Sequence, residues 1–71
     1  MRSIPKSGQK YKHFKGTIYI IICIAKDSET QKDYVIYQEE NSLDKIWSRE
    51  VNIFLDRIER PEYSGWRFTE L

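Results

Sequence analysis

The stretch Ile18-Tyr-Ile-Ile-Ile-Cys-Ile-Ala25 is an unbroken apolar run that ends at the polar segment Asp27-Ser-Glu-Thr30. Isoleucine occupies every second position from 18 to 24. Because β-branched and aromatic side chains pack well on a pleated surface, the run predicts a first strand over residues 17–26. Both faces of this strand are largely apolar, so alternation alone does not show which face is buried.

Three later segments supply the remaining expected strands. Residues 34–38 follow the polar connector 27–32, which predicts a hairpin with the first strand. Residues 45–49 predict a short third strand, and residues 66–69 predict a closing strand that pairs near the first. The expected fold is a compact antiparallel β domain in which the first strand bends across a small barrel.

One segment has helical rather than strand periodicity. Val51, Phe54, Leu55 and Ile58 lie at positions i, i+3, i+4 and i+7, which is the spacing of a helix stripe. A helix of one or two turns is therefore expected from Glu50 onward. Proline does not continue a helix, so Pro61 sets its last possible end.

The chain has 71 residues, which is room for one domain. Residues 1–10 lack a periodic apolar pattern, so we expect a flexible basic arm there and a single small β-barrel domain over residues 11–71. The net charge is only +1, yet six Lys and Arg residues precede the first acidic residue, Asp27. This basic first part favours an anionic ligand such as phosphate; the alternative is a solvated tail whose lysines serve solubility.

The single cysteine, Cys23, excludes an internal disulfide and is typical of a reducing compartment, so a cytoplasmic protein is expected. The amino terminus lacks a signal-peptide pattern, and the apolar run is shorter than the ~20 residues that span a bilayer. No membrane partner is therefore expected. The isoleucines around Cys23 favour a core position for this side chain over a role as nucleophile.

Seven short motifs lie between residues 11 and 68. They are Tyr11-Lys-His-Phe-Lys-Gly16, Tyr19 with Ala25, Ser28-Glu-Thr30, Val35-Ile-Tyr37, Trp47-Ser-Arg49, Phe54, and Arg67-Phe68. In these motifs the chain resembles the bacterial and phage family known as domain of unknown function 1653. It departs from the family pattern at Asp27, where a histidine is usual, and at Glu50, where a proline is usual.

The resemblance implies a mostly β fold, a small Src-homology-3-like antiparallel barrel with one short helix, and an activity that is unassigned. The family tends to have a polar residue at the position of Ile20, which implies that the other face of the first strand is buried. The implied inward set is Tyr19, Ile21, Cys23 and Ala25. Small barrels have many unrelated functions, so the fold by itself does not assign one.

His13 is the only imidazole of the chain. Its separation from Cys23 does not match a metal-ligand spacing, so no metal site is expected. No base, nucleophile and oxyanion donor can be assembled from the sequence, and therefore no catalytic residue and no cofactor are expected. His13 could bind an anion together with Lys15; alternatively its ring packs beside Phe14 and hydrogen-bonds across the sheet.

We expect a binding module in which aromatic rings and cations recognise an anionic or aromatic ligand, with nucleic acid or nucleotide as the first candidate. The candidate ligand-binding residues are His13, Lys15, Tyr19, Ser28, Glu29, Tyr37, Trp47 and Arg49. In the competing interpretation Trp47 is a core residue and Arg49 pairs with Glu29 or Glu50. Ser28 has the simpler alternative role of a turn residue. The alternative function is a protein-interaction module with a peptide groove, and a small enzyme is the third.

Overall fold

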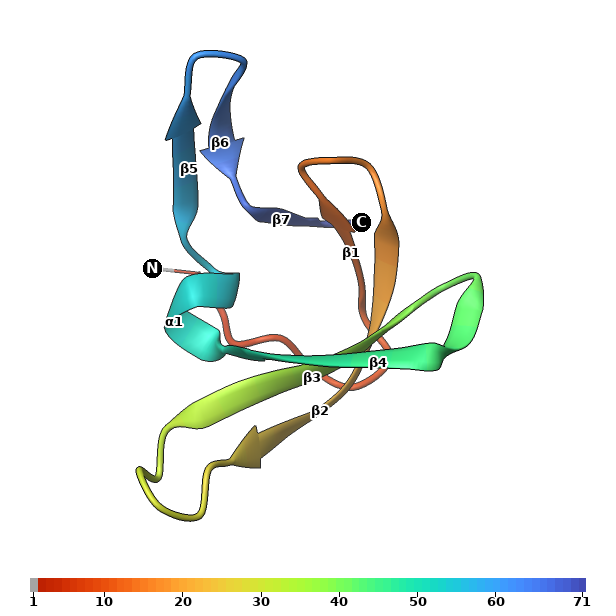
Figure 1. Cartoon of the computed structure of the whole chain (residues 1–71), viewed down its shortest axis with the longest axis vertical. Helices are drawn as coiled ribbons and strands as arrows, with labels where there is room; N and C mark the ends of the chain where they lie inside the picture. Colours follow the sequence, from red (N-terminus) through yellow and green to blue (C-terminus); the bar gives the residue numbers. More distant parts are fainter. Residues whose placement is uncertain (1) are drawn as a thin grey trace.

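The computed structural model describes residues 2–71, and within them it contains seven strands and one short helix (Figure 1). The elements are β1 (Lys10–His13), β2 (Ile18–Lys26), β3 (Asp33–Glu39), β4 (Ser42–Glu50), α1 (Val51–Phe54), β5 (Arg57–Arg60), β6 (Tyr63–Trp66) and β7 (Phe68–Glu70). The predicted class, mostly β with one short helix, is confirmed.

Five strands form one antiparallel sheet in the order β4-β3-β2-β1-β7, and β5 and β6 form a separate hairpin. Figure 1 shows this hairpin projecting away from the sheet, between α1 and β7. The edge strands β4 and β7 are not hydrogen-bonded to each other, so within residues 2–71 the sheet does not close into a complete barrel. The closing strand β7 pairs with β1 and not with the long strand β2.

The core lies between α1 and one face of the five-stranded sheet, which we call the inner face. Its central contact is the stack of Phe54 from α1 on Phe68 from β7, with ring centroids 3.9 Å apart. Tyr11 and Tyr37 meet the ring of Phe54 edge-on at 5.2 and 5.3 Å. The buried cluster comprises Tyr11, Ile21, Val35, Tyr37, Val51, Phe54 and Phe68. Without a disulfide, this aromatic cluster supplies much of the apolar burial that stabilises the domain.

A β-bulge in β2 changes which side chains face the core. The register runs Ile21↔Tyr37 and then Cys23↔Ile36, so Ile22 is an extra residue with no partner on β3. Beyond the bulge Ile24 pairs with the buried Val35 and packs against the core. The inward set is therefore Tyr19, Ile21 and Ile24.

The implied inward positions of Cys23 and Ala25 are wrong, and Cys23 is exposed rather than a core residue. The physical reason is the bulge, because one inserted residue reverses the alternation for the rest of the strand.

The helix is one turn long and ends well before Pro61. Val51 and Phe54 are buried as the stripe predicts, but the chain leaves the helix at Leu55. Asp56 then accepts a backbone hydrogen bond from Arg67, which directs the chain into β5. The last member of the predicted stripe, Ile58, is consequently buried in a strand.

The segment before β1 lies against the domain. Pro5 is buried, and the Gly8 N–H donates to the carbonyl of Ile21 at 2.8 Å. The Arg2 guanidinium donates to the carbonyl oxygens of Phe68 at 2.8 Å and of Leu55 at 3.3 Å. Flexibility of residues 1–10 stays a prediction. Residue 1 lies outside the described residues, and the contacts of residues 2–9 are those of a segment packed against β2 and the end of α1. Within residues 2–71 no helix is long and apolar enough to cross a membrane.

Candidate functional site

Five of the predicted site residues come together at one end of the inner face. His13 is paired in register with Phe68, and Trp47 with Tyr37. The ring of Tyr19 lies 5.0 Å from that of Tyr37 and 5.8 Å from that of Phe68. Arg49 lies two residues from Trp47 on β4 and therefore on the same face. We call this group, with Lys15 of the β1–β2 turn, the cationic-aromatic face; its members are His13, Lys15, Tyr19, Tyr37, Trp47, Arg49 and Phe68.

Arg49 is held over this face by the aromatic residues beneath it. Its Nε donates to the hydroxyl of Tyr37 at 3.2 Å, and its guanidinium carbon lies 5.8 Å from the centre of the Phe68 ring. Among residues 2–71 it forms no salt bridge, so the alternative pairing with Glu29 or Glu50 is wrong. A half-buried guanidinium without a carboxylate partner retains donors for an anionic ligand.

His13 packs its ring between two phenylalanines. The imidazole centroid lies 4.5 Å from that of Phe14 and 4.9 Å from that of Phe68. Its Nδ1 accepts a hydrogen bond from the Lys15 N–H at 3.1 Å, a bond within the turn rather than across the sheet. In the neutral ring with Nδ1 as acceptor, Nε2 carries the proton and is a donor.

Four cations act on His13, and one of them, Arg67, is paired with Asp56. Burial lowers the pKa of His13 below its usual value, and four cations lower it further. These cations are Arg49, Arg67, Lys15 and Arg60. They come from β4, the link before β7, the β1–β2 turn and β5, so the fold gathers at His13 charges that are far apart in sequence. A neutral donor surrounded by cations is a suitable environment for an anion.

The opposite edge of the face is polar and carries one carboxylate. Tyr19 is paired in register with Glu39, and its pKa is raised first by burial and then by the charge of Glu39.

Trp47 is 48% exposed, so the interpretation of this residue as a core side chain is wrong. Its register partner Tyr37 is buried in its place. The indole is therefore accessible to a planar ligand.

Two predicted site residues lie elsewhere. Ser28 and Glu29 occupy the turn between β2 and β3, about nine residues beyond Tyr19, which is roughly 30 Å along an extended strand. This turn is organised by Asp27, whose carboxylate accepts from the N–H groups of Glu29 and Thr30 at 3.2 and 2.8 Å. Both hydrogen bonds lower the pKa of Asp27, with that from Thr30 the larger cause. The structure does not bring Ser28 and Glu29 to the cationic-aromatic face.

The structure adds residues that the sequence analysis missed. Phe14 stacks on Tyr63 of β6 at 5.3 Å, and the guanidinium of Arg60 lies 5.2 Å from the centre of the Phe14 ring. Arg67 lies beside them, but Asp56 holds it in a two-point salt bridge at 2.7 and 3.1 Å. The signal in the sequence is the interleaving of three arginines with three aromatic residues over residues 57–68.

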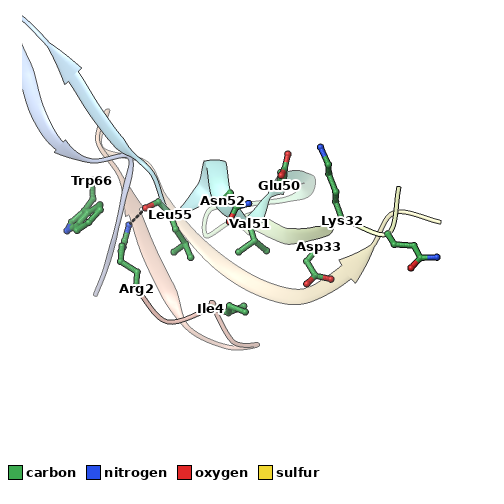
Figure 2. Close-up of a pocket in the computed structure, with 10 residues that line it drawn as sticks. Arg2, Ile4, Lys32, Asp33, Glu50, Val51, Asn52, Leu55 and Trp66 are labelled. Atoms are coloured by element: carbon green, nitrogen blue, oxygen red, sulfur yellow. Dashed lines mark hydrogen bonds between the residues drawn. The ribbon is translucent and has the colours of Figure 1, made fainter. Parts of the chain in front are cut away.

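A separate pocket of about 640 Å³ lies next to α1, and none of the eight predicted residues lines it (Figure 2). Its apolar wall includes Ile4, Val51, Leu55 and Trp66, and Arg2 and Glu50 are among its charged residues. Figure 2 shows Arg2 bonded to the Leu55 carbonyl beside Trp66, and its guanidinium carbon lies 4.3 Å from the indole centroid. The guanidinium is thus already engaged by the protein. Within residues 2–71 no three His, Cys, Asp or Glu side chains form a group that could hold a metal ion.

Comparison with known proteins adds one finding to this geometry. A family model described as "Protein of unknown function (DUF1653)" matches residues 9–70. No curated protein and no solved structure matches the chain significantly. The matched residues include all seven strands and the helix, and they contain both the cationic-aromatic face and the β5–β6 hairpin. The chain therefore belongs to the family of proteins of unknown function DUF1653.

Proposed function

We propose that the domain is a non-catalytic binding module for a ligand that combines phosphate with an aromatic ring, that is, a nucleotide or a nucleic acid. The observation that carries the proposal is the position of Arg49. Its guanidinium is hydrogen-bonded to Tyr37, lies over the ring of Phe68 beside which His13 packs, and has no carboxylate partner among the described residues. Charge-assisted hydrogen bonds from such a group are the usual means of holding phosphate.

The aromatic part of the ligand would use Trp47. Its side chain is exposed and lies two residues from Arg49 on the same face of β4. Base stacking on an aromatic side chain contributes about 1–3 kcal/mol and depends little on base identity. A phosphate at Arg49 and His13 and a base at Trp47 would therefore be bound together. We further propose that the module works in the cytoplasm, which agrees with its single unpaired cysteine.

A protein-interaction role is the second candidate, and it is favoured by a different feature. Strand β4 is an edge of the sheet and exposes Leu43 and Ile46. An extended peptide could add to this edge through main-chain hydrogen bonds. Such binding would depend little on salt, whereas binding through phosphate weakens as salt rises.

The test is a titration of the isotope-labelled protein with adenosine diphosphate and, separately, with pyrophosphate, followed by NMR. We expect shifted resonances at His13, Trp47 and Arg49, with tighter binding of the diphosphate that carries a base. Arg49→Gln should weaken diphosphate binding about 10- to 100-fold, since a hydrogen bond to a charged group contributes about 1.5–3 kcal/mol. The matched control is Lys26→Gln, which removes one charge at the far end of β2.

Three outcomes would contradict the proposal. The first is an absence of shifts at the three residues, and the second is equal weakening by Arg49→Gln and Lys26→Gln. The third is binding that shows no dependence on salt, which would instead favour the peptide interpretation.

A further inference from the structure

The cationic-aromatic face continues beyond His13 onto the β5–β6 hairpin. Phe14, next to His13 in sequence, lies with its ring 4.5 Å from the imidazole and 5.3 Å from Tyr63, nearly parallel to the latter. Arg60 lies over Phe14 at 5.2 Å, and the ammonium of Lys15 lies 5.8 Å from the same ring. Two cations therefore lie near the ring of Phe14: Lys15, which belongs to the cationic-aromatic face, and Arg60, which extends it onto the hairpin.

The two faces of the hairpin differ in charge. Arg60 and Tyr63 are register partners and share the face directed toward Phe14. The acidic residue of β5, Glu59, pairs with Ser64 and lies on the other face, where it is bound by Arg57 and Ser64. Among the described residues Arg60 forms no salt bridge, so it is available to an anion. A second acidic residue, Glu62, lies in the turn of the hairpin, two residues from Arg60.

A series of ring contacts joins Arg49 to the hairpin, and it passes below the surface at the buried Phe68. The steps run from Arg49 to Phe68, then to His13, Phe14 and Tyr63, and each is between 4.5 and 5.8 Å long. The four steps add up to about 20 Å, which is the upper limit of the separation between Arg49 and Tyr63. At the 3.4 Å spacing of phosphates in a stacked strand this covers up to about six nucleotides, and fewer when the strand is extended.

We propose that the ligand of this face is a single-stranded nucleic acid of about four to six nucleotides, with the Phe14–Tyr63–Arg60 group of the hairpin as a second contact site. The inference rests on the function proposed above and names its ligand class. Single strands expose their bases to aromatic side chains, whereas a duplex keeps them stacked inside. The length is at the lower end of the range covered by small β domains that bind single strands.

The charge of the path sets the expected salt dependence. Arg49, Lys15 and Arg60 are three cations without carboxylate partners among residues 2–71. Each phosphate contact of a single strand contributes about −0.7 to the slope of the log association constant against the log salt concentration. Three contacts therefore give a slope of about −2. Raising salt from 50 to 200 mM should then weaken binding roughly 20-fold.

The experiment measures binding of fluorescently labelled thymidine oligonucleotides of two, four, six and eight residues by anisotropy, with thymidine monophosphate as competitor. We expect affinity to rise up to about six residues and then level off. Arg60→Gln should weaken the hexamer at least fivefold and the dinucleotide clearly less, and it should reduce the slope of the hexamer's log association constant against log salt to about −1.4. The matched control is Arg57→Gln, which removes the same charge from the opposite face of the same hairpin.

Two results would overturn the inference: an affinity independent of length beyond the dinucleotide, or equal effects of Arg60→Gln and Arg57→Gln on the hexamer. If the dinucleotide still binds and depends on Arg49, the proposed function survives such a result. If neither the mononucleotide nor any oligonucleotide binds, both this inference and the proposed function are contradicted.

Discussion

Phe68→Ala is the substitution expected to affect this protein most strongly. Phe68 is 1% exposed and contacts four other rings: it stacks on Phe54, and it meets His13, Tyr19 and Tyr37 edge-on. Truncation of a buried phenylalanine to alanine costs about 3–5 kcal/mol, because apolar burial is lost and a cavity remains. At about 0.05–0.15 kcal/mol per residue, the whole chain has only roughly 4–11 kcal/mol of unfolding free energy.

Urea unfolding and thermal melting followed by far-UV circular dichroism would measure this effect. For a domain of this size each kcal/mol lowers Tm by about 4–8 °C, so Phe68→Ala should melt at least about 12 °C below the wild type or be unfolded at 25 °C. The matched control is Leu43→Ala, whose side chain is 75% exposed and whose cost should stay within about 0.5 kcal/mol. A Phe68→Ala protein that melts within a few degrees of the control would refute the assignment of this ring to the centre of the core.

Three further predictions concern His13, the Asp56–Arg67 pair and Cys23. Folding lowers the pKa of His13, so below a pH of about 6.5 the unfolded state binds more protons than the folded state. The free energy of unfolding should therefore reach its highest value above that pH and decline below it. The urea midpoint at pH 7.5 and 5.5 measures this decline, and an equal decline in His13→Gln would contradict it. A double-mutant cycle with Asp56→Asn and Arg67→Gln should give a coupling energy of about 1 kcal/mol, because the salt bridge is bidentate and only partly exposed. A coupling energy below about 0.3 kcal/mol would contradict this prediction. Cys23 should react with a thiol reagent in the native protein at nearly the rate seen in urea, and strong protection of the native thiol would show that the bulge is misplaced.

The regular features of the fold could be predicted from the sequence. The isoleucine run forms the long strand, and the hairpin across residues 27–32 forms as its polar composition indicates. The stripe of apolar residues places Val51 and Phe54 in the core. These features depend on local composition and periodicity, which are properties of the chain itself.

The missed features depend on tertiary contacts. A bulge leaves no trace in a segment that is apolar on both faces, so the exposure of Cys23 could not be read from alternation. The stripe through Ile58 fits a helix as well as a turn followed by a strand, and the Asp56–Arg67 contact decides between them. The β5–β6 hairpin likewise depends on a contact in the folded chain. Its strand β6 contains Gly65, and a β carbon at that position would lie 2.6 Å from the hydroxyl oxygen of Tyr63.

The candidate site was predicted in part. The spacing of Trp47 and Arg49 placed both on one face of a strand, and both are on the face that carries His13, Tyr19 and Tyr37. Ser28 and Glu29 belong to the Ser28-Glu-Thr30 motif, and a motif does not by itself indicate proximity to the other candidate residues in space. Arg60 and Tyr63 were missed because only the hairpin brings them beside Phe14.

The bulge at Ile22 gives this chain one position where its length can change at low structural cost. Removing Ile22 would leave Ile21, Cys23 and Ile24 as a regular ladder opposite Tyr37, Ile36 and Val35, with every remaining side chain on its present face. Removing a residue from a regular stretch, such as Val35, would instead turn half a strand of core residues toward water. Relatives one residue shorter in this strand would therefore keep the same interior, and an alignment gap belongs at Ile22.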